Sequence, residues 1–125
     1  MNFKKNIFIA ILVATFLYPP LILAETQKIN LNAIQKSAND GSMNAQISLG
    51  YLYSHGEEVP QDYIKAAKWY QKTADQGDDN AQYNLATLYY RGLGVPKNLN
   101  VAKQWYKKAA IQGNSEAKNF LDGLQ

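Results

Sequence analysis

Two consecutive stretches of 36 residues repeat one pattern, and they decide the fold of this chain. Residues 44–79 read NAQISLGYLYSHGEEVPQDYIKAAKWYQKTADQGDD, and residues 80–115 read NAQYNLATLYYRGLGVPKNLNVAKQWYKKAAIQGNS. Laid over each other without a gap, the stretches share 16 identical residues. Self-similarity at a fixed period of about 20 to 50 residues is typical of solenoid proteins, in which each repeat stacks on its neighbours.

The same register continues past both ends of the repeat. Ala38 precedes Ala74 by 36 residues, and Ala117 follows Ala81 by 36 residues. Stacked arrays need atypical capping pieces at their open ends. Within a domain over residues 25–125 we therefore expect a half-unit over 26–41, full units over 42–77 and 78–113, and a capping helix over 114–125.

The spacing of apolar residues in each unit predicts two helices. In the first, Ala45, Leu49 and Leu52 are spaced i, i+4 and i+7, which places them on one helical face. In the second, Ala66, Tyr70 and Ala74 keep a similar spacing. The predicted N-caps are Ser42, Asp62, Asp78, Asn98 and Asn114, whose side chains can accept a bond from a free backbone N–H. The predicted C-terminal stops are Gly41, Gly77 and Gly113, where a left-handed residue is favoured.

The first 24 residues differ from the rest and predict a secretory signal peptide. Lys4 and Lys5 precede an apolar run over residues 6–18, and Ala24 supplies a small residue at the exit. The alternative is a membrane anchor. The apolar run is shorter than the roughly 20 residues that span a bilayer, and Pro19-Pro20 interrupts its extension. We expect cleavage near Ala24 and no stable membrane insertion afterwards.

Charge and cysteine content narrow the classes of function. Without Lys4 and Lys5, the 13 Lys and Arg residues fall to 11 against 10 acids. A chain this close to neutral has no basic stripe of the kind that favours nucleic acid or an anionic membrane. There is no cysteine, which excludes a thiolate nucleophile and a Cys-ligated zinc site. No cofactor or metal is expected.

The repeat resembles the Sel-one-like repeats, relatives of the tetratricopeptide repeats. The family pattern Ala-x-x-x-Leu-Gly-x-x-Tyr, Gly-x-Gly-Val and Ala-x-x-Trp-Tyr appears here as Ala45, Leu49-Gly50, Tyr53, Gly56, Val59, Ala66 and Trp69-Tyr70, and again from Ala81 to Tyr106. Glu58 departs from the pattern, because it replaces the second loop glycine. The resemblance implies an all-α fold, a short right-handed α/α solenoid of antiparallel helix pairs with about six helices after the signal peptide.

The resemblance also implies a role. Members of the family bind other proteins, and bacterial members are often exported. We therefore predict a non-enzymatic adaptor, periplasmic or secreted, that binds a protein or peptide partner on the concave face and is itself a monomer. The alternative is a cell-wall or β-lactam hydrolase similar to cysteine-rich members of the family, whose cysteine framework is absent here. Self-association through weakly capped ends is a third possibility.

The first helix of each unit should line the concave face. The partner-binding candidates are Asn44, Ile47, Tyr51, His55, Asn80, Tyr83, Thr87, Tyr90 and Arg91. Exposed tyrosines beside amides suit peptide recognition, because they combine a large rigid contact area with hydrogen bonds. The alternative is that the tyrosines pack between neighbouring first helices, and the sequence leaves both interpretations open.

Other chemically active residues have simpler explanations. His55 is the only histidine, so a His-based metal cluster, or a Ser-His-Asp triad that uses any other histidine, cannot be assembled, and we expect His55 to lie at a solvated helix end. Trp69 and Trp105 could stack on carbohydrate or bases, but their 36-residue spacing favours a place in the core. The carboxylate clamp of tetratricopeptide repeats, built from Lys, Asn and Arg, is not reproduced, since Arg91 is the only Lys or Arg on the predicted face.

Overall fold

The structure is a computed structural model that describes residues 19–124, with side chains from Lys28 on except Ile29. Most of the predicted signal peptide, residues 1–18, lies outside the described residues. The chain divides into two compact units, Met1–Ala33 and Ile34–Gln125. The second unit contains both full repeats.

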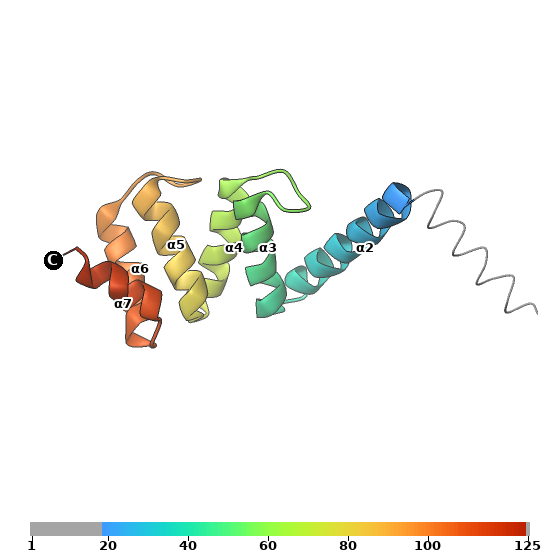
Figure 1. Cartoon of the computed structure of the whole chain (residues 1–125). Coiled ribbons are helices and arrows are strands. Elements are labelled where there is room, and N and C mark those ends of the chain that lie inside the picture. The colour runs from blue at the N-terminus through green and yellow to red at the C-terminus, as the bar shows by residue number, and fades with distance from the viewer. Residues whose placement is uncertain (1–18, 125) are drawn as a thin grey trace, which may run out of the picture. The chain divides into compact units, whose positions relative to one another are not determined.

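The described residues form six helices and no strand (Figure 1). They are α2 (Pro19–Asn39), α3 (Met43–His55), α4 (Tyr63–Asp75), α5 (Asp79–Arg91), α6 (Leu99–Ile111) and α7 (Ser115–Asp122). From α3 onward each helix packs against the next one along the chain. The expected all-α solenoid of antiparallel helix pairs is therefore confirmed.

Helix α2 is longer than the sequence predicts. It begins at Pro19, before the expected cleavage site at Ala24, and continues to Asn39. Proline is tolerated in the first turn of a helix, since its missing N–H would have no partner there. Pro19 and Pro20 therefore start this helix.

The five predicted N-caps are confirmed. Ser42, Asp78 and Asn114 accept bonds from the backbone N–H groups of Ala45, Ala81 and Ala117 and start the first helices. Asp62 and Asn98 do the same for Lys65 and Val101 at the second helices. Gly77 and Gly113 each follow a helix end with a left-handed φ of 99°, as expected.

The loops between paired helices contain the main backbone difference between the units. Gly94 has a φ of 68°, and Glu58 at the equivalent position takes the same left-handed conformation with a φ of 60°. A Cβ on Gly94 would clash with the backbone carbonyl group of Tyr63. The glycine is needed in the second unit because the α4 backbone lies against it, whereas Glu58 is exposed.

Tyrosines rather than tryptophans fill the centre of the core. Tyr70 and Tyr106 are 3% and 2% exposed, beside Leu49, Leu85 and small residues. Trp69 and Trp105 are only half-buried, with Lys72 and Lys108 ammonium groups 5.5 and 4.0 Å from their ring centroids. The prediction that both tryptophans lie in the core therefore holds only in part, because both are half-buried, although Trp105 packs against both clusters of buried residues.

Gly50 has a packing reason. A Cβ at this position would lie 2.6 Å from the Tyr70 ring, so the ring occupies the space a side chain would need. Ala86 takes the equivalent position in the second unit and is fully buried. The two units therefore place a tyrosine against a small residue with slightly different spacing.

A ladder of glutamines connects successive helix pairs. Buried Gln46 donates to the Ala38 carbonyl at 3.0 Å, and Gln82 donates to the Ala74 carbonyl at 3.2 Å. Their side-chain oxygens accept bonds from Gln76 at 3.1 Å and Gln112 at 2.8 Å. These glutamines are identical in both units because each satisfies a buried polar group of its neighbour.

Candidate functional site

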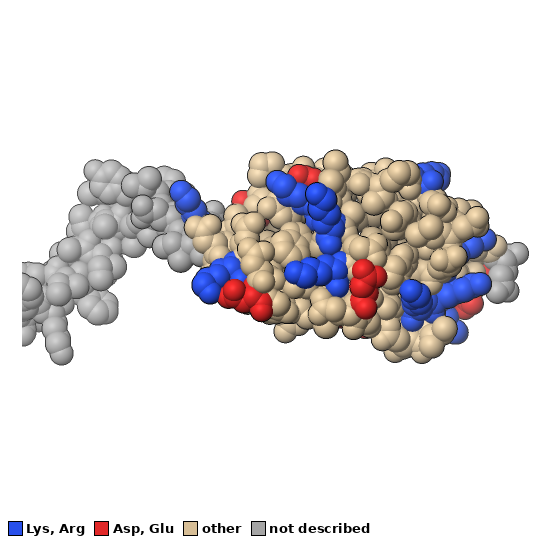
Figure 2. Space-filling model, turned by 180° about the vertical axis from the view of Figure 1, so that it is seen from behind, with Lys and Arg blue, Asp and Glu red and all other residues tan. Residues whose placement is uncertain are grey.

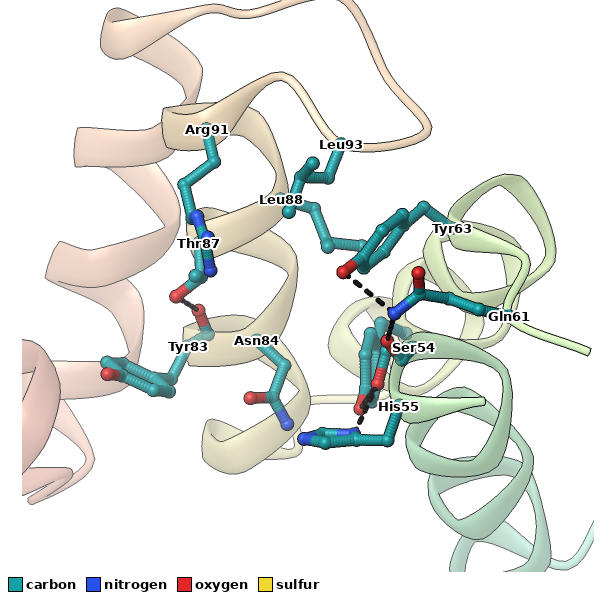
Figure 3. Close-up of a pocket in the computed structure, with 11 residues that line it drawn as sticks. Ser54, His55, Gln61, Tyr63, Tyr83, Asn84, Thr87, Leu88, Arg91 and Leu93 are labelled. Atoms are coloured by element: carbon teal, nitrogen blue, oxygen red, sulfur yellow. Dashed lines mark hydrogen bonds between the residues drawn. The ribbon is translucent and has the colours of Figure 1, made fainter. Parts of the chain in front are cut away.

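A pocket of about 380 Å³ lies between α3 and α5, beside the two loops that follow these helices (Figure 3). Its lining residues come from both repeats and are mostly polar or aromatic. They are Ser54, His55, Gln61, Tyr63, Tyr70, Tyr83, Asn84, Thr87, Leu88, Arg91 and Leu93.

The wall nearest α3 is held by side-chain hydrogen bonds. The Gln61 amide donates to the Ser54 carbonyl at 2.9 Å and to the Tyr63 hydroxyl at 3.0 Å. These two bonds tie the loop and the start of α4 to the last turn of α3. The opposite wall is α5, which contributes Asn84, Thr87 and Arg91, and of these Asn84 points toward His55 (Figure 3).

His55 is oriented by the helix that carries it. Its Nδ1 lies 3.0 Å from the Tyr51 carbonyl and 2.9 Å from Ser54 Oγ. A carbonyl oxygen only accepts, so this contact favours the tautomer with the proton on Nδ1. In that tautomer Nδ1 is not available as a base for Ser54. The Tyr51 ring stacks on the imidazole with centroids 4.0 Å apart and restricts it further.

Two tyrosine hydroxyls at this end of the repeat stay protonated over a wide pH range. Burial raises the pKa of Tyr70, whose hydroxyl lies 3.4 Å from Ser54 Oγ. The negative charge of Glu57 raises the pKa of Tyr51, which donates to that carboxylate at 3.2 Å. Both tyrosines can therefore act as hydrogen-bonding groups and not as phenolates.

The pocket has an uneven charge. Arg91 is exposed and supplies a permanent cation, and no carboxylate is among the described residues that line the pocket. Ser54, Asn84 and Thr87 add neutral hydrogen-bonding groups, while Leu88 and Leu93 add apolar surface. This combination suits a partner group that is polar or negatively charged and continues into an apolar part.

The predicted site residues divide into two sets. His55, Tyr83, Thr87 and Arg91 line the pocket. The others lie on or near the same helices but outside its lining, namely Asn44, Ile47, Tyr51, Asn80 and Tyr90. The pocket therefore contains four of the nine predicted residues, and the other five lie outside its lining.

Several of these side chains also have packing partners. The Tyr83 and Tyr106 rings have centroids 5.6 Å apart, and Tyr90 meets Phe120 edge-on at 4.9 Å. Thr87 Oγ1 lies 2.9 Å from the Tyr106 hydroxyl. Tyr51, in contrast, is 44% exposed. Packing thus accounts for part of the tyrosine pattern, and a role in binding stays a prediction.

Sequence reasoning missed four residues that line the pocket, three of which come from the loops and from α4. Gln61, Tyr63, Asn84 and Leu93 line the pocket, but only Asn84 lies on a first helix. The available signal was their variation, because the equivalent residues in the other unit are different in all four cases. Their convergence requires the packing of α4 between α3 and α5, which the repeat alone does not give.

Residues 19–124 hold no group of three or more His, Cys, Asp or Glu side chains placed to bind a metal ion. No helix in the same range is both long enough and apolar enough to cross a membrane.

The fold and repeat define a class of protein, and comparison with known sequences gives the family. The Sel1 repeat family matches residues 44–78 and 79–114, which together exceed half of the chain. The chain therefore belongs to the Sel1 repeat family. Proteins with these repeats are mostly protein-interaction modules.

Known relatives include one sequence and several solved structures. The chain is 36% identical over 68 residues to the secretory immunoglobulin A-binding protein EsiB of Escherichia coli, and the match takes in 54% of this chain but only 14% of that protein. A Sel1 repeat protein from Oxalobacter formigenes is similar with a TM-score of 0.70 and 40% identity, covering 72% of this chain and 68% of the other.

Two further solved structures are similar to the chain. A protective antigen of uropathogenic Escherichia coli has a TM-score of 0.66 and 38% identity, over 67% of this chain and 18% of the antigen. Cysteine rich protein B of Helicobacter pylori has a TM-score of 0.67 and 30% identity, over 72% of this chain and 68% of that protein.

Proposed function

We propose that this protein is an exported interaction module that binds a segment of a protein partner in the pocket between α3 and α5. The observation that supports this proposal is that residues which the repeat pattern does not fix meet in this pocket. His55, Asn84 and Arg91 line the pocket, yet each differs from its equivalent in the other repeat. The repeat therefore leaves these positions free for recognition.

The pocket chemistry suits a peptide. Asn84 and Ser54 can exchange hydrogen bonds with a peptide backbone, and Leu93 and Tyr63 provide apolar surface for a side chain. Arg91 adds a site for a carboxylate, which makes charge-assisted hydrogen bonds with a guanidinium. A peptide that carries an acid beside an apolar residue uses all three features.

Export is supported by the sequence and by the relatives. Residues 1–24 predict a signal peptide, which is followed by the domain over 25–125 with the repeat boundaries given above. Two relatives are an immunoglobulin-binding protein and a protective antigen, by name proteins that meet a host. We propose a periplasmic or secreted location, in which the mature chain acts as a monomer.

Peptide display on the immobilised full chain would test the pocket. Selected peptides would be measured by fluorescence anisotropy against Arg91→Ala and Asn84→Ala. We expect Arg91→Ala to weaken binding about ten-fold, the loss of one charge-assisted contact. The control is Gln104→Ala on α6, an exposed residue that does not line the pocket.

Two results would contradict the proposal. One is selected peptides that bind both pocket variants as tightly as the parent chain. The other is an equal loss with Gln104→Ala, which would indicate a general effect on folding. Tyr51→Ala, just outside the pocket, would show whether the interface extends along α3.

We also propose that the protein acts without catalysis. Among the described residues, the only serine hydroxyl within hydrogen-bonding distance of a histidine is that of Ser54, beside His55. The Nδ1 of His55 is directed to the Tyr51 carbonyl. A chromogenic β-lactam incubated with the full chain should therefore show no turnover above the buffer blank. Turnover that Ser54→Ala abolished would revive the hydrolase alternative.

A further inference from the structure

A second groove lies on α4, and the pocket described above does not include it. It has a volume of about 280 Å³ and is lined by Lys65, Lys68, Trp69 and Lys72. The Trp69 ring is half-buried, and the Lys72 ammonium lies 5.5 Å from its centroid. Three positive side chains therefore border one aromatic surface.

The positive charge of this groove is largely uncompensated. Lys65 forms an ion pair with Asp62 at 3.4 Å, but Lys68 and Lys72 are in no salt bridge within the described residues. Asp75, the one acid within α4, accepts a hydrogen bond from Gln71 instead. Figure 2 shows blue cationic side chains gathered in the middle of this surface beside a smaller red area.

An apolar groove adjoins the lysines. It has a volume of about 380 Å³ and shares Lys68 with the first groove. Its other lining residues include Ile64, which is 59% exposed, together with Leu85, Tyr89 and Val95. A cationic surface and an apolar groove therefore meet at Lys68.

The repeat does not require the lysines. Val101 and Gln104 take the positions of Lys65 and Lys68 in the second unit, while Trp105 and Lys108 repeat Trp69 and Lys72. Helices α4 and α6 have the same length and equivalent N-caps. Helix α6 also has three lysines, but they are Lys103, Lys107 and Lys108, so only the first unit has positive charge at the positions of Lys65 and Lys68.

We propose that this face of α4 is a docking surface for an acidic, partly apolar peptide segment of a second protein. Charge complementarity places acids of the segment against the lysines, and its apolar side chain in the groove beside Ile64. A lipid surface fits less well. Membrane-binding helices project aromatic side chains outward, whereas Trp69 lies half-buried beneath Lys72.

The residues of the second unit provide the test variant. Lys65→Val with Lys68→Gln introduces the residues that α6 has at these two positions and should leave the fold intact. Lys68→Gln alone is a second, milder variant. The matched control is Lys97→Gln with Lys107→Gln, which removes the same charge and introduces the residues that the first unit has at these positions, Gln61 and Gln71.

The probe is a fluorescent peptide of the pattern Glu-Leu-Glu-Glu-Leu-Glu, measured by anisotropy with the full chain. We expect binding that the double α4 variant weakens about five-fold, as two exposed ion pairs predict. The control variant should bind as the parent chain does, and Arg91→Ala measures separately any binding of the same peptide in the pocket between α3 and α5. A peptide with Gln in place of every Glu should not bind.

Three results would overturn this proposal. The first is no binding of the acidic peptide to the parent chain. The second is equal weakening by the α4 and control variants, which would indicate only net charge. The third is binding to vesicles of phosphatidylglycerol and phosphatidylcholine in equal parts that the peptide does not displace, which would make the surface a membrane site.

Discussion

Residues 44–79 and 80–115 build the same pair of helices with the same caps, yet they present different surfaces. Among the identical residues, Leu49 and Leu85 are buried, as are Tyr70 and Tyr106. Among the residues that differ, His55 and Arg91 line the pocket between the first helices, and Lys68 lies in the groove on α4. Comparing the units therefore separates what the fold requires from what it leaves free.

The loops between the paired helices show that whether a position is free to vary depends on what packs against it. Both units need a left-handed residue in the loop, but only the second places that residue against another backbone. Glu58 accepts the strained conformation because nothing forces it to be small, while Gly94 has no such freedom. Equivalent positions in a repeat are therefore not equivalent in energy when their neighbours differ.

The largest expected effect on stability is in the loops between the paired helices. Gly94→Ala should lower the free energy of unfolding by about 3 kcal/mol or more, because a left-handed penalty adds to a backbone clash. Glu58→Gly at the equivalent position should change it by less than about 1 kcal/mol, since relief of strain is offset by chain entropy. Urea unfolding followed by circular dichroism measures both. Equal changes in the free energy of unfolding would contradict the inference that the two loop positions have different surroundings.

The glutamine ladder should respond equally in both units. Gln46→Ala and Gln82→Ala each remove two side-chain hydrogen bonds, one to a carbonyl and one from a partner glutamine, so each should cost about 2 kcal/mol. Urea unfolding again gives the values. A loss confined to one variant would show that one copy of the ladder has no energetic role.

Removing the hydroxyl groups of the two core tyrosines should change the free energy of unfolding by smaller and unequal amounts. Tyr106→Phe removes a hydroxyl that lies 2.9 Å from Thr87 Oγ1, and should cost about 1 kcal/mol. Tyr70→Phe removes a contact of 3.4 Å, which is longer than the usual O–H···O distance, so its cost should be under about 0.5 kcal/mol. Thermal unfolding of the two variants would check the order, and a reversed order would contradict it.

The smallest effect concerns the caps of the second helices, where Asp62 can titrate and Asn98 cannot. Hydrogen bonding to the Lys65 backbone N–H lowers the pKa of Asp62 below its usual 3.8. A lowered folded-state pKa adds stability that is present above the unfolded value and lost as pH falls through the folded one. Asp62→Asn should keep the cap and reduce the loss of stability below about pH 4.

The measurement is the difference in urea midpoint between the parent chain and Asp62→Asn, taken at neutral and acid pH. The difference should shrink or change sign as the medium becomes acidic, because only the parent loses the carboxylate. Parallel pH profiles for the two proteins would show that Asp62 does not contribute.

Much of the fold could be predicted from the sequence because it depends on local rules. The N-caps at Ser42, Asp62 and Asn114 and the left-handed Gly77 follow from backbone groups that need a partner nearby. The 36-residue register then places small and large residues against each other. The early start of α2 at Pro19 was not predicted, since proline was given only its role as a helix breaker.

The candidate site was less predictable. Arg91 and His55 were found because they lie on a first helix and vary between units. Gln61 and Tyr63 were not found, since they reach the pocket only when α4 packs against α3 and the loop folds back. The partial exposure of Trp69 was also missed, because its periodicity indicates its position in the repeat but not how deeply the ring is buried.

The sequence by itself determined the number of repeats, the helices, their caps and the absence of cysteine chemistry, because these depend on spacing along the chain. The tertiary structure decided which side chains share a surface. It placed Asn84 opposite Ser54 in one pocket, set Lys68 beside an apolar groove that α5 also lines, and made glycine necessary at Gly94 but not at Glu58. Such contacts join residues from different helices, and spacing alone does not specify them.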